Sequence, residues 1–162
     1  MKTEATILLF RGRGLTSNLI RWQSRGPWSH AAIEMGGQVW EAIQWKRVRR
    51  RGIGEVIAEC EKSRTRLAGI KVEITQEQGF EMIRWLNKQL GKRYDWSSVL
   101  RFVTRQQASR RAAEVWFCSE LVFAAFRHVD IHLLARTQPW EVSPALLART
   151  PFGGELQPIV QP

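Results

Sequence analysis

Residues 116–123 read Trp-Phe-Cys-Ser-Glu-Leu-Val-Phe, and they place a thiol where a short apolar segment ends and a helix begins. Four apolar residues that share one stripe of that helix follow the thiol: Leu121, Val122, Ala125 and Phe126. A cysteine in the first helical turn meets unpaired backbone N–H groups and the positive end of the helix dipole, which both favour the thiolate. The stretch therefore predicts Cys118 at a helix start, a position that commonly prepares a cysteine nucleophile.

The length and composition of the chain indicate one globular unit. Its 162 residues suffice for one domain with a hydrophobic core and are too few for two comfortable ones. The longest apolar runs, 7–10 and 121–126, are far shorter than the roughly 18 residues of a membrane span. The first residues lack the apolar core of a signal peptide. We expect a single domain over residues 1–162, with an irregular tail from about residue 150, in the cytoplasm; a phage-encoded or released protein is the alternative.

The remaining thiol and the histidines carry no metal pattern. Cys60 lies between two glutamates, which raise the pKa of a thiol, so we expect it to be structural. Neither cysteine belongs to a CxxC pair. His128 and His132 have the i, i+4 spacing of metal ligands but lack an HExxH context and a third ligand. The expectation is no metal and no cofactor.

The charge is strongly positive, with 25 Lys and Arg against 15 Asp and Glu and a net charge of +10. The excess is densest at Lys46, Arg47, Arg49, Arg50 and Arg51. Such a surface attracts nucleic acid, anionic lipid or an acidic cell-wall polymer, although a solvated basic loop explains the run equally well. No nucleic-acid-binding motif accompanies it.

Hydrophobic periodicity and turn residues predict the following elements. We expect strands at 6–10, 29–35, 38–44 and 70–74, helices at 15–23, 76–90, 99–103 and 118–128, and a short helix from Ser143-Pro144. Segments 46–54 and 105–113 read as irregular. The helix from 76 is capped by Thr75 and Gln78, and its predicted inner residues are Phe80, Ile83, Leu86 and Leu90.

The strands at 29–35 and 38–44 flank Gly36-Gly37, a two-residue hairpin signal. A tight turn pairs Met35 with Gln38, Ala32 with Glu41 and His30 with Ile43. His30 and Glu41 then lie diagonally on one face of the sheet, within reach of each other. Glu34 competes for His30 from the same strand, but cross-strand neighbours approach more closely, so Glu41 is preferred.

A cysteine nucleophile needs an imidazole to take its proton and a polar group to orient that imidazole. His30 and Glu41 are the candidates for these two roles beside Cys118. Tyr94 is the candidate for a hydroxyl that binds a developing oxyanion. Asp95 reads as a helix cap, and Glu120 as a structural partner of the first N–H groups of the cysteine helix.

Five segments in order carry a resemblance to a known family: Ser29-His30-Ala31-Ala32-Ile33, Val39-Trp40-Glu41-Ala42, Tyr94-Asp95, residues 117–122 and Ser143-Pro144. Together they resemble the circularly permuted branch of the NlpC-type cysteine peptidases, the YiiX-like proteins, which are related to the lecithin–retinol acyltransferase family. The resemblance runs from about Thr6 to Leu147. His30 precedes Cys118, as the permuted branch requires.

The resemblance implies an α+β, papain-like fold, with the cysteine helix packed on an antiparallel sheet or small barrel that carries the histidine. By position, Cys118 matches the nucleophile, His30 the base and Glu41 the third polar residue. The implied chemistry is attack on an amide or ester carbonyl through a thioacyl-enzyme, with the backbone N–H of Cys118 helping to bind the oxyanion. A glutamate replaces the second histidine of the acyltransferase relatives, which favours amide hydrolysis.

Three functions follow as expectations. The first is a cysteine peptidase or amidase that acts on a small peptide, a peptidoglycan fragment or another acyl-amide. The second is an acyltransferase or thioesterase that acts on an acyl lipid, with the basic run docked on an anionic membrane. The third is a binding module that keeps the fold without turnover.

Overall fold

The computed structural model describes residues 1–43, 46–94, 115–151 and 156–161. Its centre is an open sheet of six strands in the order β4-β3-β2-β1-β5-β8, and every neighbouring pair is antiparallel. The strands are β1 (Lys2–Arg11), β2 (His30–Met35), β3 (Gln38–Ala42), β4 (Val48–Gly52), β5 (Arg66–Thr75) and β8 (Gln157–Val160). The expected α+β class with an antiparallel sheet is confirmed, and the sheet is open rather than closed into a barrel.

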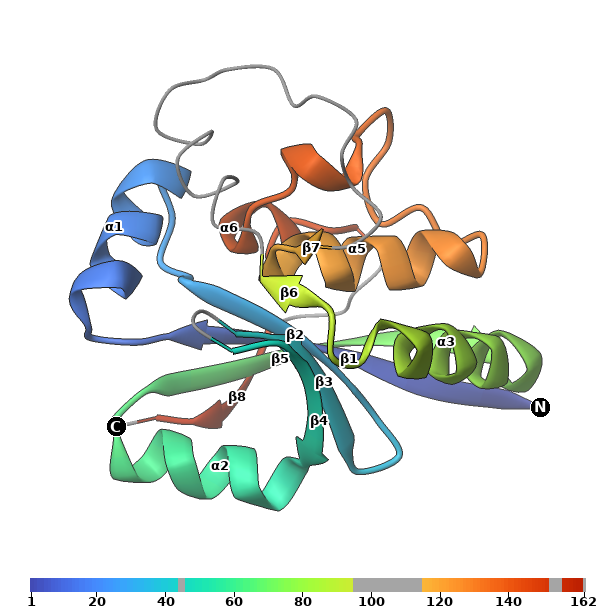
Figure 1. Ribbon diagram of the computed structural model, residues 1–162, viewed down its shortest axis with the longest axis horizontal. Helices are drawn as coiled ribbons and strands as arrows, with labels where there is room; N and C mark the ends of the chain where they lie inside the picture. The colour runs from blue at the N-terminus through green and yellow to red at the C-terminus, as the bar shows by residue number, and fades with distance from the viewer. Residues whose placement is uncertain (44–45, 95–114, 152–155, 162) are drawn as a thin grey trace.

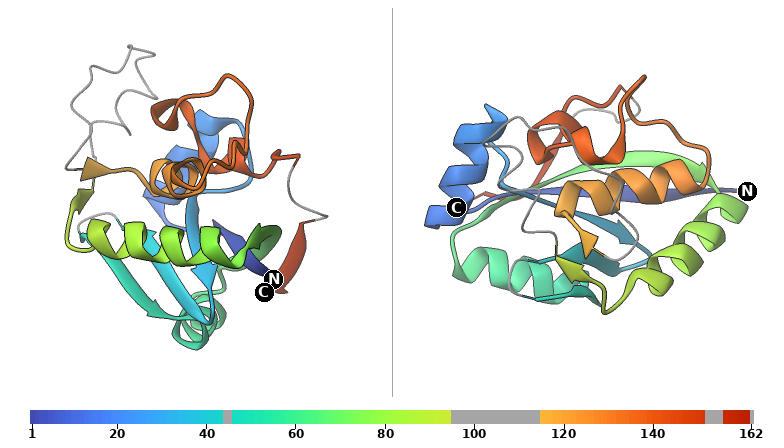
Figure 2. Two further views of the ribbon diagram at one scale, coloured as in Figure 1. Left: turned by 90° about the vertical axis from the view of Figure 1, so that its right-hand side faces the viewer. Right: turned by 45° about the horizontal axis from the view of Figure 1, so that its top comes forward.

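Helices cover both faces of this sheet (Figures 1 and 2). The helices α3 (Gln76–Gln89) and α5 (Cys118–His128) pack on one face, and α2 (Ile53–Lys62) packs on the other. Successive strand residues point to opposite faces, so Ala31 and Ile33 enter the larger core with α5, whereas Ala32 enters the smaller core with α2. The strands thus separate two hydrophobic layers.

The β2–β3 hairpin forms as its glycines predict. Gly36 and Gly37 have φ angles of 57° and 80°, a left-handed pair that suits a tight hairpin turn. Met35 pairs with Gln38 and Ile33 with Trp40, which is the predicted register. The described ladder ends at Ile33–Trp40 and does not include the predicted pairs Ala32–Glu41 and His30–Ile43. Gln44 lies outside the described residues.

Three parts of the chain differ from the sequence expectation. The segment 46–54 was expected to be irregular, but β4 occupies most of it and pairs with β3. Helix α2 follows directly and was not predicted. The tail from 150 was expected to be irregular, but β8 pairs with β5 and buries Val160 against the smaller core.

Helix α3 confirms its predicted cap and corrects its predicted inner face. Thr75 Oγ1 accepts from the Gln78 N–H, and Gln78 Oε1 accepts from the Thr75 N–H. Phe80 and Leu90 are 63% and 39% exposed, so their placement on the inner side is wrong. The buried side of α3 contains Gly79, Met82 and Leu86, so the buried face begins one residue earlier than predicted.

The remaining described elements are α1 (Leu15–Ser24), the strand pair β6 (Arg93–Tyr94) and β7 (Val115–Trp116), η1 (Pro139–Glu141) and α6 (Pro144–Leu147). Ser143 caps α6 by accepting from the Leu146 N–H, as predicted. The predicted helix at 99–103 with its Asp95 cap and the segment 105–113 lie outside the described residues. In the described ranges, no helix has the length and apolar character to cross a membrane.

Candidate active site

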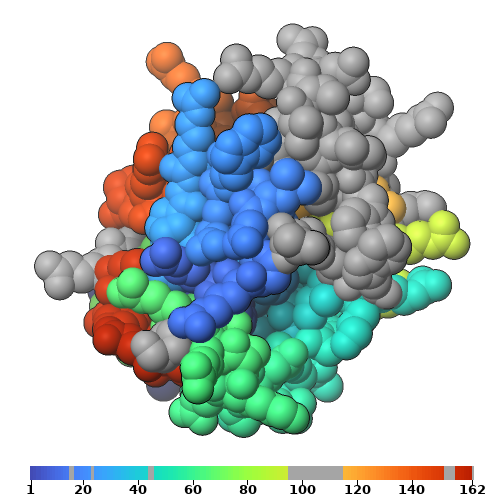
Figure 3. Space-filling view, turned by 90° about the vertical axis from the view of Figure 1, so that its left-hand side faces the viewer, coloured from blue at the N-terminus to red at the C-terminus, as the bar shows by residue number. Residues whose placement is uncertain are grey.

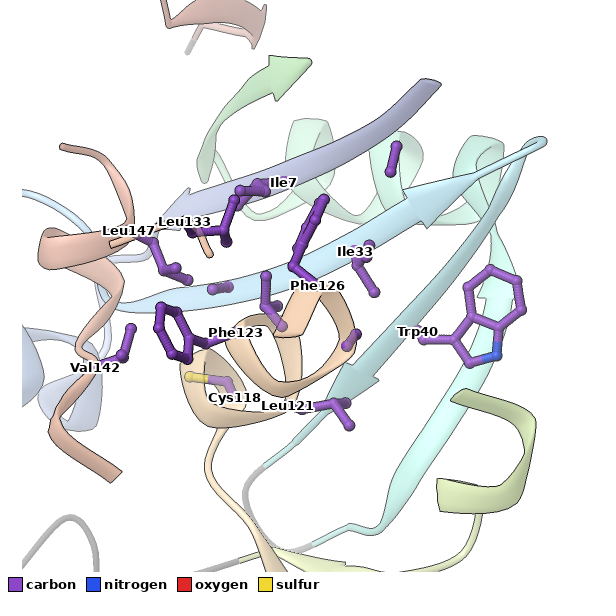
Figure 4. Close-up of a cluster of buried hydrophobic side chains, with 14 of the residues drawn as sticks. Ile7, Ile33, Trp40, Cys118, Leu121, Phe123, Phe126, Leu133, Val142 and Leu147 are labelled. Carbon is purple, nitrogen blue, oxygen red and sulfur yellow. The ribbon is translucent and has the colours of Figure 1, made fainter. Parts of the chain in front are cut away.

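Cys118 is the first residue of α5, as the sequence predicts, and it is buried with 1% of its surface exposed. The helix start is fixed by its neighbours: Glu120 Oε2 accepts from the Phe117 N–H at 3.1 Å, and Ser119 Oγ donates to the Val142 carbonyl at 2.5 Å. Figure 4 shows the Cys118 side chain at the N-terminal end of the helix, within the cluster that includes Phe123. Glu120 therefore has the structural role that was expected.

His30 begins β2 and pairs with Phe10 on β1. Their rings lie 5.0 Å apart between centroids. The preceding Ser29 is buried; its Oγ accepts from the Gly12 N–H and donates to the Phe10 carbonyl, which fixes the chain just before His30. The His30 side chain keeps 24% of its surface exposed. The imidazole is thus held by the sheet yet open to solvent on one side.

Glu41, on β3, binds His30 from the neighbouring strand. Its Oε2 lies 3.1 Å from His30 Nε2, and its side chain is 1% exposed. The Glu41 Oε1 atom accepts from Arg49 Nε at 3.0 Å and from Arg51 Nε at 2.7 Å, both on β4. Glu34, the competitor, instead accepts from the Gly37 N–H at 2.7 Å in the hairpin turn. The structure therefore brings Glu41, not Glu34, to the imidazole.

The pKa values of His30 and Glu41 are both shifted by their neighbours. Burial by itself lowers the pKa of an imidazole, but the charge and hydrogen bond of Cys118, followed by the hydrogen bond and charge of Glu41, raise the pKa of His30 to about 10. Burial would raise the pKa of the Glu41 carboxyl, but His30 and the two arginines lower it to about 2. Because Nε2 faces Glu41, Nδ1 is the ring nitrogen left for Cys118.

A cavity of about 230 Å³ opens beside this group, and His30, Glu41 and Tyr94 are among its lining residues. Tyr94, on β6, is buried and its ring tilts against Phe117 at 5.7 Å between centroids. Cys118 is not among the described lining residues of this cavity. The structure thus places the oxyanion candidate in the same cavity as the imidazole and the carboxylate.

Cys60, on α2, lines the same cavity as His30 and Glu41. Burial, and then the negative charge of Glu59, raise the pKa of its thiol to about 11. A thiol with that pKa is almost fully protonated at neutral pH and is therefore a poor nucleophile.

Arg49 and Arg51 are partners of Glu41 that the sequence analysis did not identify. They belong to the basic run that was expected either to attract an anionic partner or to be a solvated loop, but both bind Glu41, and Arg51 also binds Glu59. The sequence does contain one signal for this arrangement: Arg49 and Arg51 are two residues apart, and residues with that spacing in a strand share one face of the sheet.

The other histidines lie apart from this group. His128 stacks on Trp85, with 5.5 Å between the ring centroids. His132 Nε2 lies 3.3 Å from Asp130 Oδ1. Within the described ranges, no three His, Cys, Asp or Glu side chains gather in a way that would hold a metal ion.

Comparison with known proteins identifies a similar fold but does not assign the chain to a family. No family model matches the chain, and no curated protein matches it. Among solved structures, metalloprotein YiiX from Escherichia coli O157:H7 matches with a TM-score of 0.70 and 17% identity, covering 99% of this chain and 97% of that one. At this identity the likeness shows the fold alone, and the chain has a YiiX-like fold.

Proposed function

We propose that this protein is a cysteine hydrolase of the amidase or peptidase type, with a Cys118-His30-Glu41 triad on a permuted papain-like fold. The observation that carries the proposal is the 3.1 Å hydrogen bond between His30 and Glu41, together with the effect of Cys118, at a helix start, on the pKa of His30. A nucleophile, a base and an orienting carboxylate in contact are the arrangement that nucleophilic acyl transfer requires.

The proposed reaction has two stages. His30 holds the proton of Cys118, and the thiolate attacks the carbonyl carbon of an amide, forming a C–S bond and an oxyanion. The C–N bond then breaks, His30 gives its proton to the leaving amine, and a thioacyl-enzyme remains. His30 next takes a proton from water, the resulting hydroxide attacks the thioester, and the carboxylic acid leaves as Cys118 recovers its proton.

Other groups have supporting roles in this scheme. Glu41 holds Nε2 of His30 so that Nδ1 faces the sulfur, and its charge stabilises the imidazolium. The Cys118 backbone N–H at the start of α5 and the Tyr94 hydroxyl are the proposed oxyanion donors. Tyr94 supports this role by lining the cavity with His30.

The description of the structural neighbour as a metalloprotein does not carry over to the residues described here. No group of three potential ligands gathers in the described part of the chain. His30 Nε2 is already bonded to the Glu41 carboxylate, which two arginines also hold. The donor set does not fit a metal ion, so no step of the proposed reaction uses one.

The proposed substrate is an amide of cell-wall peptide type, and product analysis tests it. Purified protein is incubated with muropeptides, and products are identified by mass spectrometry. We expect a mass gain of one water per cleaved amide, abolished in Cys118→Ala and retained in Cys60→Ala. Cleavage that survives in Cys118→Ala would overturn the proposal.

An acyltransferase or thioesterase acting on acyl lipids is the second candidate. Helix α1 favours it by exposing Leu19 and Trp22, 42% and 73% accessible, three residues apart on one face. The same assay on acyl lipids separates the two, because a transferred acyl chain or released fatty acid replaces the shortened peptide. A binding module without turnover gives no product in either arm.

A further inference from the structure

Five arginines from separate parts of the chain line a second pocket, of about 530 Å³. They are Arg11 at the end of β1, Arg13 in the following loop, Arg21 on α1, Arg64 after α2 and Arg66 at the start of β5. Gly12 and Gln161 complete the lining. Figure 3 faces this side of the molecule, where the blue β1–α1 region lies against the green α2–β5 region. We name this group of residues the arginine pocket.

No described residue forms an ion pair with the arginines of the arginine pocket. Its described lining contains no carboxylate, and none of the ion pairs among the described residues involves these five arginines. Arg11 and Arg66 are direct cross-strand partners on β1 and β5. Like charges placed directly opposite each other repel, so this pair destabilises the sheet locally. A bound anion would reduce the repulsion.

Arg21 adds a buried donor for which the described residues provide no acceptor. Its Nη2 donates to Asn18 Oδ1, but its Nε is buried, and no described group accepts a hydrogen bond from it. Buried donors are almost always satisfied, so an unsatisfied one beside a charged pocket points to a missing acceptor. Arg21 differs in this respect from Arg49 and Arg51, whose Nε atoms both bond to Glu41.

We propose that the arginine pocket binds the phosphate groups of a small phosphorylated molecule. Guanidinium groups pair bidentately with phosphate oxygens, and a cluster of five suits a ligand that carries more than one negative charge. The convergence of four chain segments around one hollow favours a compact ligand over an extended polymer, which binds along open stripes of charge.

The arginine pocket adjoins the candidate active site. Gly12 lines both the arginine pocket and the cavity that contains His30 and Tyr94. Ser29 accepts a hydrogen bond from the Gly12 N–H, which couples this shared wall to the residue before His30. If the proposed hydrolase function holds, and this point rests on it, the pocket anchors a phosphate next to the scissile amide of the same substrate.

Calorimetric titration of inorganic pyrophosphate tests the site without relying on turnover. It is performed on the Cys118→Ala protein and on the same protein with Arg64→Gln and Arg66→Gln, two exposed positions. The matched control is Arg50→Gln with Arg136→Gln, which removes the same charge at exposed positions elsewhere. We expect saturable one-to-one binding that weakens at least about tenfold in the pocket variant and less than about twofold in the control.

Two outcomes would overturn the proposal. One is an equal loss in both variants, which would mean non-specific attraction to the net charge. The other is no pyrophosphate binding by any variant while vesicles of phosphatidylglycerol bind and phosphatidylcholine vesicles do not, which would mean a membrane surface instead. The binding assay uses Cys118→Ala and does not depend on turnover, so it separates the two proposals. If pyrophosphate binds but the unmodified protein cleaves no muropeptide, the phosphate site stands and the proposed hydrolase activity is rejected.

Melting temperatures give a second readout that also controls for folding. Without pyrophosphate, the Arg64→Gln, Arg66→Gln protein should melt at the same or a higher temperature, because the repulsion between Arg11 and Arg66 is removed. Pyrophosphate should raise the melting temperature of the control variant and not that of the pocket variant. A pyrophosphate-dependent rise of equal size in both would contradict the assignment.

Discussion

Glu41 combines two tasks in one buried carboxylate. One oxygen holds the imidazole of His30, and the other is held by Arg49 and Arg51. The charge stabilises an imidazolium, whereas the hydrogen bond fixes the ring, and a carboxamide would keep only part of the second effect. Removing the charge would also leave two partly buried guanidinium groups without their shared partner.

Glu41→Gln should therefore lower both activity and stability. We expect kcat/KM for muropeptide cleavage to fall roughly 100-fold, because the base loses its orientation and its charge partner. The free energy of unfolding should fall by about 3 kcal/mol, because a buried ion-pair network loses its anion. Steady-state kinetics and urea denaturation measure the two effects.

Glu34→Gln is the matched control. Glu34 Oε1 accepts from the Gly37 N–H, and a glutamine oxygen accepts from the same group. Activity should stay within about twofold, and stability should change by no more than about 0.5 kcal/mol. If Glu34→Gln slowed turnover as much as Glu41→Gln, the assignment of Glu41 as the orienting residue would be wrong.

The shifted pKa values define where the His30–Glu41 pair stabilises the fold. The stability from His30 is complete below its ordinary pKa of 6.5 and is lost as pH rises through about 10. The stability from Glu41 is complete above its ordinary pKa of 4.5 and is lost as pH falls through about 2. The melting-temperature difference between the unmodified protein and Glu41→Gln should be largest between these two ordinary values. A difference that does not change between pH 2 and pH 10 would contradict the paired protonation states.

At the scale of elements, the β2–β3 hairpin places Glu41 on the strand next to His30, within hydrogen-bonding distance of it. Its turn requires left-handed backbone at Gly36 and Gly37, with φ of 57° and 80°. A side chain at either position is strained by its backbone alone, because open space surrounds both glycines. Helix α2 offers the opposite case in Gly54, a helical glycine that also has open space around it.

Gly37→Ala and Gly54→Ala should shift stability in opposite directions. Gly37→Ala should cost about 1–2 kcal/mol, because alanine resists the left-handed conformation. Gly54→Ala should gain about 0.5–1 kcal/mol, because glycine is the weaker helix former. Urea denaturation of both variants gives the comparison, and a cost at Gly54 equal to that at Gly37 would contradict the strain argument.

Elements with strong local signals could be predicted from the sequence, and those defined by distant partners could not. The Gly36-Gly37 turn, the Thr75–Gln78 cap and the Ser143-Pro144 start all act within a few residues. Strand β4 is rich in arginine, so its composition is typical of an irregular segment. Its stabilising partner, Glu41, belongs to another strand, and this contact cannot be seen in the local sequence. The inner face of α3 was shifted because Gly79, which carries no hydrophobic signal, lies against Thr3 and Met35.

At the scale of the whole molecule, the sheet joins residues from both ends of the chain. β1 lies near its centre, and β8 adds the last strand beside β5. Val160 is 7% exposed and packs in the smaller core, whereas its neighbour Ile159 is 41% exposed. Such long-range pairing is invisible to local patterns, which explains why the tail was expected to be irregular.

Val160→Ala should destabilise the protein by about 1–2 kcal/mol, because buried methyl groups are lost from the smaller core. Ile159→Ala serves as the control and should change the free energy of unfolding by less than about 0.5 kcal/mol. Thermal or urea unfolding measures both variants. Equal effects would mean that β8 does not pack as described.

The candidate site could be predicted as far as its residue types and chain order allowed. A helix-start cysteine, a strand histidine and a cross-strand glutamate carried enough information to name Cys118, His30 and Glu41. The two arginines on Glu41 and the arginine pocket could not be named, because each depends on segments that meet only in the folded molecule. The proposed activity depends on a contact in which His30 takes the proton of Cys118.

Alkylation of Cys118 by iodoacetamide tests that contact most directly, followed by intact-mass spectrometry at neutral pH. The rate for Cys118 is measured in a Cys60→Ala protein, and the rate for Cys60 in a Cys118→Ala protein. Cys118 should react at least about tenfold faster, because the pKa of the Cys60 thiol is raised to about 11. His30→Ala should slow the reaction of Cys118 about tenfold or more. Equal rates for the two thiols, or a Cys118 rate unchanged by His30→Ala, would contradict an imidazole-activated nucleophile.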